Sequence, residues 1–467
     1  MIKVSPASQL RGRIVLPASK SISNRALIIN ALSGNTIQPE NLSDSDDTRV
    51  MLRALETVSN SKTPSNSPLK GENKIQNASP LREGLIGVID IGAAGTAMRF
   101  LTAYLSVTPG EHVITGTERM KHRPISILVD ALRQLGASIT YEGEEGFPPL
   151  RIVGKDNLEG GELAVPGDVS SQYISALLMI APTLQKGLRL TLTGQIASRP
   201  YLEMTISMMR NFGAKVEWHD DNVIDVLPGP YQKRAYTIES DWSAASYWYE
   251  MVALSRDANA EVDLVGLHHD SIQGDSKVWH LFSELGVETQ YFVEPDGTEI
   301  TRLRKGGTLT SYFSYDFTHQ PDLAQTFAAT CSMLGVPFRL YGLQSLRIKE
   351  TDRIAALMKE LGKMVELEEK ESEMMTPHPP LGGAMVNGQA ALDGRRESQW
   401  SMVNNILVFD TYEDHRMAMA LAPVCLRTGG PIQINNPQVV SKSYPTFWED
   451  LQKVGFKTTY EMKIIKL

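Results

Sequence analysis

The chain has 467 residues, of which 42% are hydrophobic and 21% charged, and its formal net charge is −8 at pH 7. These values are typical of an ordinary globular protein with two domains of about 200 residues each, because one compact core rarely grows larger. The negative net charge argues against a general binder of nucleic acid or of anionic membranes.

The sequence contains two cysteines, Cys331 and Cys425, and neither lies in a CxxC or Cys/His pattern. We therefore expect no disulfide framework and no structural zinc site, which fits a reducing compartment. The segment 1–16 lacks the apolar core of a signal peptide, and the longest apolar runs, such as 173–184, are too short to span a bilayer. The sequence predicts a cytoplasmic protein.

The first motif in chain order is the segment 16–27, where an extended run turns into a helix that carries Lys20 and Arg25. Serines at 19, 21 and 23 are natural N-cap residues, and a helix N-terminus attracts phosphate or carboxylate groups. Alone, the motif fits a capped surface helix with two solvated cations equally well. Cations gathered into motifs of an acidic protein favour one focused site for a small anion.

A pattern of amphipathic helix, apolar residue, glycine and strand recurs about every 75 residues. Its glycines suit the left-handed conformation that ends a helix, and they are Gly136, Gly213, Gly286, Gly362 and Gly455. A helix over 47–58 adds a sixth unit without its glycine. Six similar α/β units in two domains explain the spacing, although helix–glycine–strand is common in any α/β protein. The polar segment Ser59–Gly84 reads as a loop, and Glu366–Trp400 as a surface excursion.

More helix starts that carry glycine, hydroxyl groups or charges follow along the chain. A glycine-rich loop at 92–99 lacks the ending of a P-loop and the third glycine of a dinucleotide-binding motif. A basic run at 119–124 precedes a helix expected to start at Pro124. The other segments of this kind are 168–173, 198–201, 319–322, 348–353, 410–420 and 441–445. Each one alone fits helix capping or a salt-bridged helix.

Taken together and in this order, the motifs resemble the enolpyruvyl transferase family. The resemblance runs from Leu16 to Pro445 and rests on SKSISNRALI, AGTAMR, RMKHRPI, DVSSQY, SRPY, DWSAASYW, QGDSK, QPD, IKETDRI, EDHRMAMA and SKSYP. It implies an α/β fold, a two-domain inside-out α/β barrel in which each domain has three βαβαββ units around a deep cleft. The implied domains are residues 1–18 plus 239–467, and residues 19–238, with the active site in the cleft between them.

The resemblance also implies a reaction. The enolpyruvyl group of phosphoenolpyruvate would move to the 5-hydroxyl of shikimate 3-phosphate, with release of phosphate, by addition and elimination in the shikimate pathway of aromatic amino-acid biosynthesis. It implies no cofactor, no metal and no nucleic-acid or membrane partner, and we expect a monomer.

Site residues follow from the matching motifs. Phosphoenolpyruvate would be bound by Lys20, Gly95, Arg123, Gln172, Arg353, Arg416 and Lys442. Shikimate 3-phosphate would be bound by Lys20, Ser21, Arg25, Ser170, Ser171, Gln172, Ser198, Tyr201, Asp322, Ser345 and Lys349. The resemblance implies Asp322 as the base for the 5-hydroxyl, Glu350 as the acid that protonates the methylene carbon, and Lys20 as the group that stabilises developing charge.

Glu350 lies between Lys349 and Arg353 in the sequence, and their charges favour its ionised form. To donate a proton at neutral pH, it would need burial or an approaching substrate carboxylate.

The chain departs from the usual family pattern at four positions. Ala18 stands for Gly, Ala93 for Asn, Phe100 for Pro and Ser345 for Asn. Two of these changes shorten or remove a polar group near the proposed site.

Two other functions compete with this interpretation. The UDP-N-acetylglucosamine enolpyruvyl transferase of cell-wall synthesis resembles the chain, but it uses a loop cysteine as general acid, and Cys331 and Cys425 both lie in apolar helices. A non-catalytic phosphosugar-binding protein on the same fold would be expected to lack Asp322 or Glu350, and both are present.

Overall fold

A computed structural model describes residues 1–61, 87–370, 373–376, 402–403 and 406–461. Contacts divide the chain into two compact units. Unit 1 comprises Met1–Ser19, Ser43–Ser45 and Glu239–Leu467, and unit 2 comprises Lys20–Leu42 and Asp46–Ile238. The two segments at which the chain leaves and re-enters unit 1 are hydrogen-bonded to each other, since the Ser19 N–H donates to the Glu239 carbonyl (2.9 Å) and the Asp241 N–H to the Pro17 carbonyl (2.9 Å).

Unit 2 contains two sheets with one topology. In each sheet, the first two strands along the sequence are parallel neighbours. The fourth strand lies between the second and the third strand and is antiparallel to both. The first sheet and its helices are β3 (Gly87–Asp90), α3 (Gly95–Ser106), β4 (Gly110–Thr115), α4 (Glu118–Lys121), α5 (Ser126–Gln134), β5 (Ser138–Tyr141) and β6 (Leu150–Gly154). The second set is β7 (Gly161–Pro166), α6 (Ser171–Ile180), η1 (Ala181–Thr183), β8 (Leu188–Thr193), α7 (Arg199–Asn211), β9 (Val216–Asp220) and β10 (Val223–Val226).

The remaining part of unit 2 holds α1 (Lys20–Leu32) and α2 (Asp46–Ser61), with an isolated parallel bridge between Glu40 and Thr237. The loop predicted over Ser59–Gly84 lies outside the described residues from position 62 onward.

The described residues of unit 1 form three sheets, and the first two have the same pairing pattern. The first set is β2 (Arg11–Val15), α8 (Trp242–Leu254), β11 (Glu261–Val265), η2 (Gly274–Lys277), α9 (Val278–Ser283), β12 (Leu285–Val293) and β13 (Glu299–Leu309). The second is β14 (Phe313–Asp316), η3 (Pro321–Leu323), α10 (Ala324–Leu334), β15 (Phe338–Tyr341), η4 (Gln344–Ile348), α11 (Arg353–Leu361), β16 (Glu368–Lys370) and β17 (Glu373–Met375). The excursion expected over Glu366–Trp400 therefore supplies two strands of this sheet, and its residues 371–372 and 377–400 lie outside the described part.

The third sheet of unit 1 combines both ends of the described chain. Its elements are β18 (Met402–Val403), β19 (Ile406–Phe409), α12 (His415–Leu421), η6 (Ala422–Leu426), β20 (Ile432–Ile434), η7 (Pro437–Lys442), α13 (Phe447–Lys453), β21 (Lys457–Tyr460) and β1 (Ile2–Ser5). Strand β1 lies between β20 and β21 and is antiparallel to both, so the first strand of the chain completes the last sheet.

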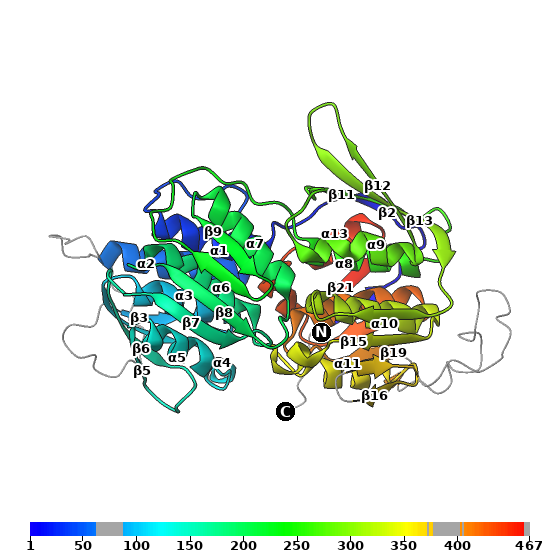
Figure 1. Cartoon of the computed structure of the whole chain (residues 1–467). Coiled ribbons are helices and arrows are strands. Elements are labelled where there is room, and N and C mark those ends of the chain that lie inside the picture. Colours follow the sequence, from blue (N-terminus) through cyan, green and yellow to red (C-terminus); the bar gives the residue numbers. More distant parts are fainter. Residues whose placement is uncertain (62–86, 371–372, 377–401, 404–405, 462–467) are drawn as a thin grey trace, which may run out of the picture. The chain divides into compact units, whose positions relative to one another are not determined.

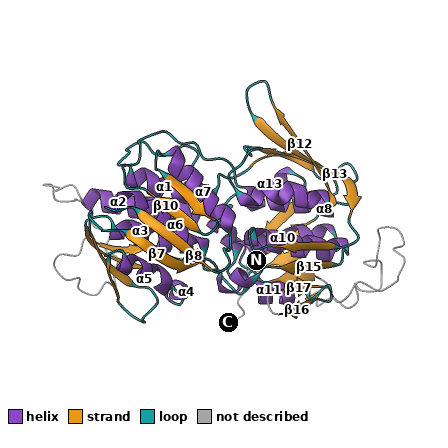
Figure 2. Cartoon of the chain, in the orientation of Figure 1, coloured by secondary structure: helices purple, strands orange, loops and turns teal. Residues whose placement is uncertain are grey.

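Helices form the centre of each unit, and sheets cover them (Figures 1 and 2). Every residue of α3 is buried, as is α6 from Tyr173 to Ile180, whereas strands such as β11 alternate between buried and partly exposed residues. A helix buried on all sides belongs to a core, and an alternating strand has one face toward that core. Helices α3 and α6 therefore belong to the core of unit 2.

The glycines of the repeat behave as expected with one exception. Positive φ angles occur at Gly136 (98°), Gly213 (84°), Gly286 (79°) and Gly455 (102°). The expectation for Gly362 was wrong, because this residue is helical with φ −60°. A Cβ atom there would lie 2.4 Å from the Met358 carbonyl oxygen, so close packing rather than conformation accounts for glycine at this position.

One carboxyl group is enclosed in the core of unit 1 on α8. Glu250 is fully buried, and within the described residues neither of its carboxyl oxygens has a hydrogen-bond partner. Burial raises the pKa of Glu250 well above its usual range. The folded chain thus keeps a proton that the unfolded chain loses near pH 4.3 (an approximate reference pKa), so this residue lowers stability as pH rises above that value.

We expect Glu250→Gln to remove this pH-dependent cost. At pH 8 the thermal midpoint of the variant should lie above that of the wild-type protein by about 2–4 °C or more, and the difference should shrink at pH 5. Thermal unfolding followed by circular dichroism at both pH values measures it. A difference that does not depend on pH would contradict a protonated Glu250.

Candidate active site

Four charged side chains of unit 1 meet where helical segments begin. Asp322 lies in η3 directly before α10, Arg353 is the first residue of α11, and Asp414 is the N-cap of α12, which also carries Arg416. The Asp414 carboxylate accepts a hydrogen bond from the Arg416 backbone N–H (2.8 Å). Carboxylates are favoured there because helix N-termini carry unpaired N–H groups and a partial positive charge.

Arg353 is the centre of this arrangement, with only 2% of its side chain exposed. Its Nε donates to Asp414 Oδ2 (2.6 Å), its Nη1 to Asp322 Oδ1 (3.1 Å) and its Nη2 to Glu350 Oε2 (2.8 Å). A buried guanidinium is tolerated when carboxylates neutralise it, and three of them do so here. We call Asp322, Lys349, Glu350, Arg353, Asp414 and Arg416 the Arg353 cluster.

Asp322 lies within ion-pair distance of all three cations of the Arg353 cluster. Arg416 Nη2 donates to its Oδ2 (2.7 Å), and Lys349 Nζ lies 3.8 Å from its Oδ1. Burial raises the pKa of Asp322, but the charges of Arg416, Lys349 and Arg353 outweigh burial and hold the pKa well below its usual range. In this form Asp322 is a weak base, so a reaction that uses it must first draw cations away.

The pKa of Lys349 is lowered as well, which for an amine disfavours the charged form. Burial lowers its pKa, and the charges of Arg353 and Arg416 add to the effect, while Asp322 and Glu350 oppose it. Its ammonium group therefore gains from any further anion that enters the cluster.

The two remaining site candidates of unit 1 lie on 3₁₀ segments. Lys442 ends η7, and its Nζ donates to the Glu413 carbonyl (2.7 Å). Glu413 and the preceding Tyr412 have positive φ angles of 57° and 53°, a strained pair that immediately precedes α12. Ser345 lies half-buried in η4.

In unit 2, Arg25 is buried among neutral groups. Its guanidinium donates to Thr205 Oγ1 (2.7 Å), to the Ser21 carbonyl (3.0 Å) and to Ser175 Oγ (3.1 Å), and it lies 5.9 Å from the ring centroid of Tyr201. Burial lowers the pKa of Arg25 to about 10. Among the residues that the structure describes, no carboxylate pairs with this guanidinium, so its charge is available to an incoming anion.

Gly95 and Arg123 come together at the start of α3. A Cβ atom built on Gly95 would lie 2.6 Å from Arg123 Nη1 and 3.0 Å from both its Cζ and Nη2. Only glycine therefore lets this guanidinium lie directly against the first turn of the helix. The helix expected at Pro124 begins instead at Ser126, because the preceding basic run forms the separate short helix α4.

The start of α6 lies beside the start of α3. Gln172 Nε2 donates to Thr96 Oγ1 (3.1 Å), and the Ser170 hydroxyl caps α6 by accepting from the Gln172 N–H (3.4 Å). Ser171 is the first residue of α6. Tyr173 of the same helix donates its hydroxyl to the Pro124 carbonyl (2.5 Å) and so fixes the segment that carries the basic run.

The remaining candidates of unit 2 are on α1 and α7. Lys20 opens α1, and its Nζ lies 3.6 Å from Asp47 Oδ2. Ser198 is the N-cap of α7 and has a left-handed backbone with φ 54°. Its carbonyl accepts from the Tyr201 N–H (3.0 Å), and the ring of Tyr201 lies beside Arg25.

Within unit 1 the structure brings together Asp322, Lys349, Glu350, Arg353 and Arg416, and within unit 2 it brings Arg25 to Ser21 and Tyr201 and Gly95 to Arg123. Sequence reasoning missed the neighbours that position them, namely Asp47, Thr96, Ser175, Thr205 and Asp414. One signal was present, because Ser175 and Thr205 lie four residues after Ser171 and Tyr201 and so share their helix faces.

A family model for EPSP synthase (3-phosphoshikimate 1-carboxyvinyltransferase) matches residues 4–451. The chain belongs to the EPSP synthase family. A 3-phosphoshikimate 1-carboxyvinyltransferase of Bacteroides fragilis is 52% identical over 457 residues, covering 97% of both chains. One of Photobacterium profundum is 35% identical over 462 residues, covering 97% of this chain and 99% of its own. The solved EPSP synthase of Acinetobacter baumannii has the same fold, with a TM-score of 0.71, 21% identity and coverage of 98% and 99%.

The two cysteines argue against the alternative activity, that of the UDP-N-acetylglucosamine enolpyruvyl transferase with its loop cysteine as general acid. Cys331 lies in α10 and Cys425 in η6, and both are buried. Burial raises the pKa of each thiol above its usual range. Neither thiol is accessible or acidic enough to serve as the general acid.

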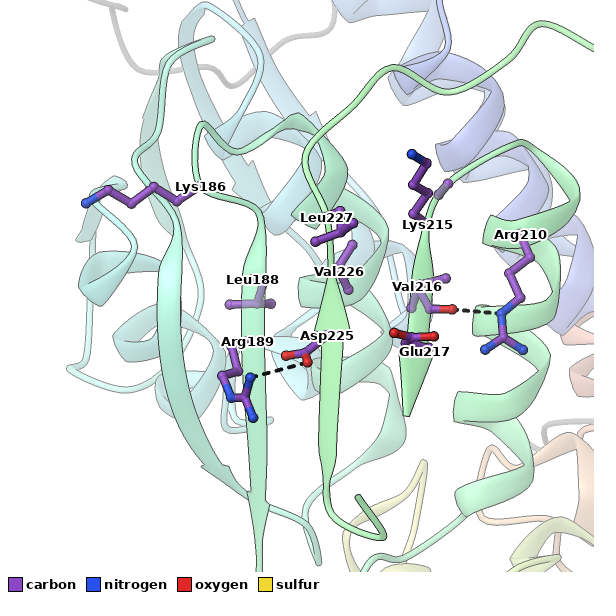
Figure 3. A pocket seen from close by; sticks show the side chains of 11 residues that line it. Lys186, Leu188, Arg189, Arg210, Lys215, Val216, Glu217, Asp225, Val226 and Leu227 are labelled. Atoms are coloured by element: carbon purple, nitrogen blue, oxygen red, sulfur yellow. Dashed lines mark hydrogen bonds and ion pairs between the residues drawn. The ribbon is translucent and has the colours of Figure 1, made fainter. Parts of the chain in front are cut away.

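A hollow of about 740 Å³ lies over strands β8 to β10 of unit 2 (Figure 3). It is lined by Lys186, Leu188, Arg189, Arg210, Ala214, Lys215, Val216, Glu217, Asp225, Val226 and Leu227. Arg189 pairs with Asp225 (3.3 Å), and Arg210 Nε donates to the Val216 carbonyl (2.7 Å). It contains none of the residues that the EPSP synthase motifs indicate, and its lining carries both signs of charge.

Membrane spans and metal sites are both absent from the described ranges, namely 1–61, 87–370, 373–376, 402–403 and 406–461. No helix in them is long and apolar enough to cross a membrane. No group of three or more His, Cys, Asp or Glu side chains in them could hold a metal ion.

We expect Asp414→Asn to destabilise unit 1 by about 3 kcal/mol, because it leaves part of the charge of a buried guanidinium unpaired. Unfolding in urea measures the change. Glu294→Gln is the control, since it breaks the exposed ion pair with Arg13 (2.8 Å) and should cost less than about 1 kcal/mol. Equal effects of the two substitutions would show that the Arg353 cluster adds no more stability than a surface pair.

Proposed function

We propose that the chain transfers the enolpyruvyl group of phosphoenolpyruvate to the 5-hydroxyl of shikimate 3-phosphate and releases phosphate. The proposal places both substrates in a cleft between a domain of residues 1–18 plus 239–467 and a domain of residues 19–238, each an inside-out barrel of three units. The observation that carries it is that Asp322 and Glu350, the two groups proposed to move protons, share the guanidinium of Arg353. Membership of the EPSP synthase family supports the same reaction.

Binding of the two anionic substrates requires cations, and unit 2 supplies an uncompensated one in Arg25. We assign the phosphoenolpyruvate contacts to Lys20, Gly95, Arg123, Gln172, Arg353, Arg416 and Lys442. Shikimate 3-phosphate is assigned to Lys20, Ser21, Arg25, Ser170, Ser171, Gln172, Ser198, Tyr201, Asp322, Ser345 and Lys349. Each charge-assisted hydrogen bond contributes roughly 1.5–3 kcal/mol, so a few of them suffice for micromolar binding.

Substrate binding would also activate Asp322. The carboxylate and phosphate groups of phosphoenolpyruvate compete for Arg353 and Arg416, and each guanidinium contact that moves to the substrate weakens the hold on Asp322. The carboxylate then becomes a stronger base at the moment when the hydroxyl of shikimate 3-phosphate is present. The same competition at Arg353 loosens Glu350 and favours its protonated form.

The proton transfers balance in two steps. In the addition, Asp322 takes the proton of the 5-hydroxyl, the hydroxyl oxygen bonds to C2 of phosphoenolpyruvate, and Glu350 gives a proton to the methylene carbon. In the elimination, the new methyl group returns a proton to Glu350, the bond from C2 to the phosphate oxygen breaks, and phosphate leaves with the proton held by Asp322. Lys20 would stabilise charge on the reacting oxygens.

The direct test mixes the purified chain with shikimate 3-phosphate and phosphoenolpyruvate and follows release of phosphate. Phosphate release should require both compounds. UDP-N-acetylglucosamine in place of shikimate 3-phosphate is the control and should give none. If phosphate is released from phosphoenolpyruvate with UDP-N-acetylglucosamine but not with shikimate 3-phosphate, the chain catalyses the other enolpyruvyl transferase reaction and the proposal is overturned.

We expect Glu350→Gln to bind both substrates but to turn over about 10²–10⁴ times more slowly, because one proton transfer loses its donor. Steady-state kinetics with each substrate varied in turn measure kcat and KM. Near-normal kcat would remove Glu350 from the reaction.

Gly95→Ala should weaken phosphoenolpyruvate binding through Arg123. The added Cβ would displace the guanidinium, and loss of one charge-assisted contact raises KM for phosphoenolpyruvate by about 10- to 100-fold. Gly87→Ala in the same region is the control, because no atom lies within 4 Å of a Cβ built there. Equal KM values for phosphoenolpyruvate in the two variants would argue against contact between Arg123 and this substrate.

A further inference from the structure

The segment 271–277 of unit 1 is fastened to the start of α8. The buried Gln273 side chain donates from Nε2 to the Ser240 carbonyl (2.7 Å) and accepts at Oε1 from the Trp242 N–H (3.1 Å). Its own N–H donates to Ser271 Oγ (3.0 Å). These bonds fix the following residues of η2 against the first turn of α8.

Asp275 is the charged residue that this attachment places in the interior. It is only 3% exposed, and its Oδ2 accepts a hydrogen bond from the Ser243 hydroxyl. Its Oδ1 is buried and, within the described residues, has no hydrogen-bond partner. A carboxylate with one unsatisfied oxygen is costly in such surroundings, whereas the protonated acid is tolerated.

Several charged or titratable groups face Asp275 from neighbouring elements. Burial and the charge of Asp322 raise the pKa of Asp275 to about 7, and Asp241 at the N-cap of α8 acts in the same direction. The hydrogen bond from Ser243 and the charge of Arg416 act against them. Arg416 approaches the same face of α8, because its Nη1 donates to the hydroxyl of Tyr247 (3.5 Å), one helical turn after Ser243. Tyr315 of β14 also lies within electrostatic reach, since Asp275 contributes to its raised pKa.

We propose that Asp275 is a positioning residue whose proton controls how much of the Arg416 charge is available to phosphoenolpyruvate. Protonated, Asp275 leaves Arg416 to Asp322 and the incoming substrate. Ionised, it adds a second carboxylate beside Asp322, attracts Arg416 and repels the anionic substrate. This inference rests on the proposed function, because it assigns the Arg416 guanidinium to phosphoenolpyruvate.

Because proton binding at Asp275 and phosphoenolpyruvate binding are linked, the direction of the pH effect on substrate affinity follows. Raising the pH through 7 ionises Asp275 in the free enzyme, so phosphoenolpyruvate binds more weakly above that pH. By reciprocity, bound phosphoenolpyruvate favours the protonated form of Asp275 by the same factor. Two charges that interact inside a protein commonly change each other's affinity by about 5- to 20-fold.

The experiment measures KM for phosphoenolpyruvate from pH 6 to pH 8.5 at saturating shikimate 3-phosphate. In wild-type protein KM should rise about 5- to 20-fold across this range. Asp275→Asn, which keeps the shape but cannot ionise, should match the wild type at pH 6 and lose most of the rise. Asp270→Asn is the matched control, because that carboxylate is fully exposed nearby and should leave the profile unchanged. The ionisation of phosphoenolpyruvate itself is common to all variants.

Ser243→Ala supplies a second arm that does not alter the carboxyl group. It removes a hydrogen bond that lowers the pKa of Asp275, so the rise of KM should move to higher pH. If Asp275→Asn raises KM equally at all pH values, or keeps the wild-type rise, the inference is overturned, and the same holds if Ser243→Ala leaves the profile in place. Active wild-type protein with such results would leave the proposed function intact, whereas an inactive wild type would overturn that function itself.

Discussion

The guanidinium of Arg353 has to be neutralised inside unit 1, and this requirement organises the surrounding structure. Three carboxylates, from the segment before α10, the turn before α11 and the N-cap of α12, converge on it. Removing a charge from water costs several kcal/mol, so none of these segments can shift without leaving a charge unpaired. The geometry of the candidate catalytic groups in unit 1 is therefore tied to the stability of that unit.

The buried cations of the two units differ in how far they are neutralised by carboxylates. The Arg353 cluster contains three cations and three carboxylates and is close to neutral while Asp275 keeps its proton. Arg25 in unit 2 is surrounded by hydroxyl groups, a carbonyl and an aromatic ring. An arriving anion would thus meet a ready cation at Arg25, whereas at the Arg353 cluster it has to compete with carboxylates already present. This arrangement favours tight binding of an anion at Arg25. At the Arg353 cluster it favours a change in the protonation of the carboxylates.

Much of this could be predicted from the sequence, for identifiable reasons. Helix starts are encoded locally, so the segments that carry Lys20, Gln172 and Arg416 were placed correctly at the beginnings of α1, α6 and α12. The motif order also indicated the family. Element boundaries were less certain, as shown by α5, and Gly362 was misread because close packing and a left-handed turn both select glycine.

Partners far apart in the sequence could not be predicted. Thr205 contacts Arg25 across 180 positions, and Asp414 contacts Arg353 across 61. Nothing in the local pattern distinguishes such a residue from an ordinary polar position in a helix, because its role depends on which helices become neighbours. Likewise, Asp275 belongs to a motif that was recognised, but its unsatisfied oxygen is visible only once η2 is packed against α8.

Strand β1 has a consequence for the order of assembly. It is synthesised early relative to its partners, because β20 and β21 are made more than 400 residues later. Unit 2 is synthesised in between as one nearly continuous stretch and can fold while the early strand still waits. Ile2 is paired with Tyr460 in the finished sheet, so a rearranged chain in which a short peptide leads from β21 into β1, with new termini opened in a surface turn, would let β1 emerge directly after β21 and remove the delay.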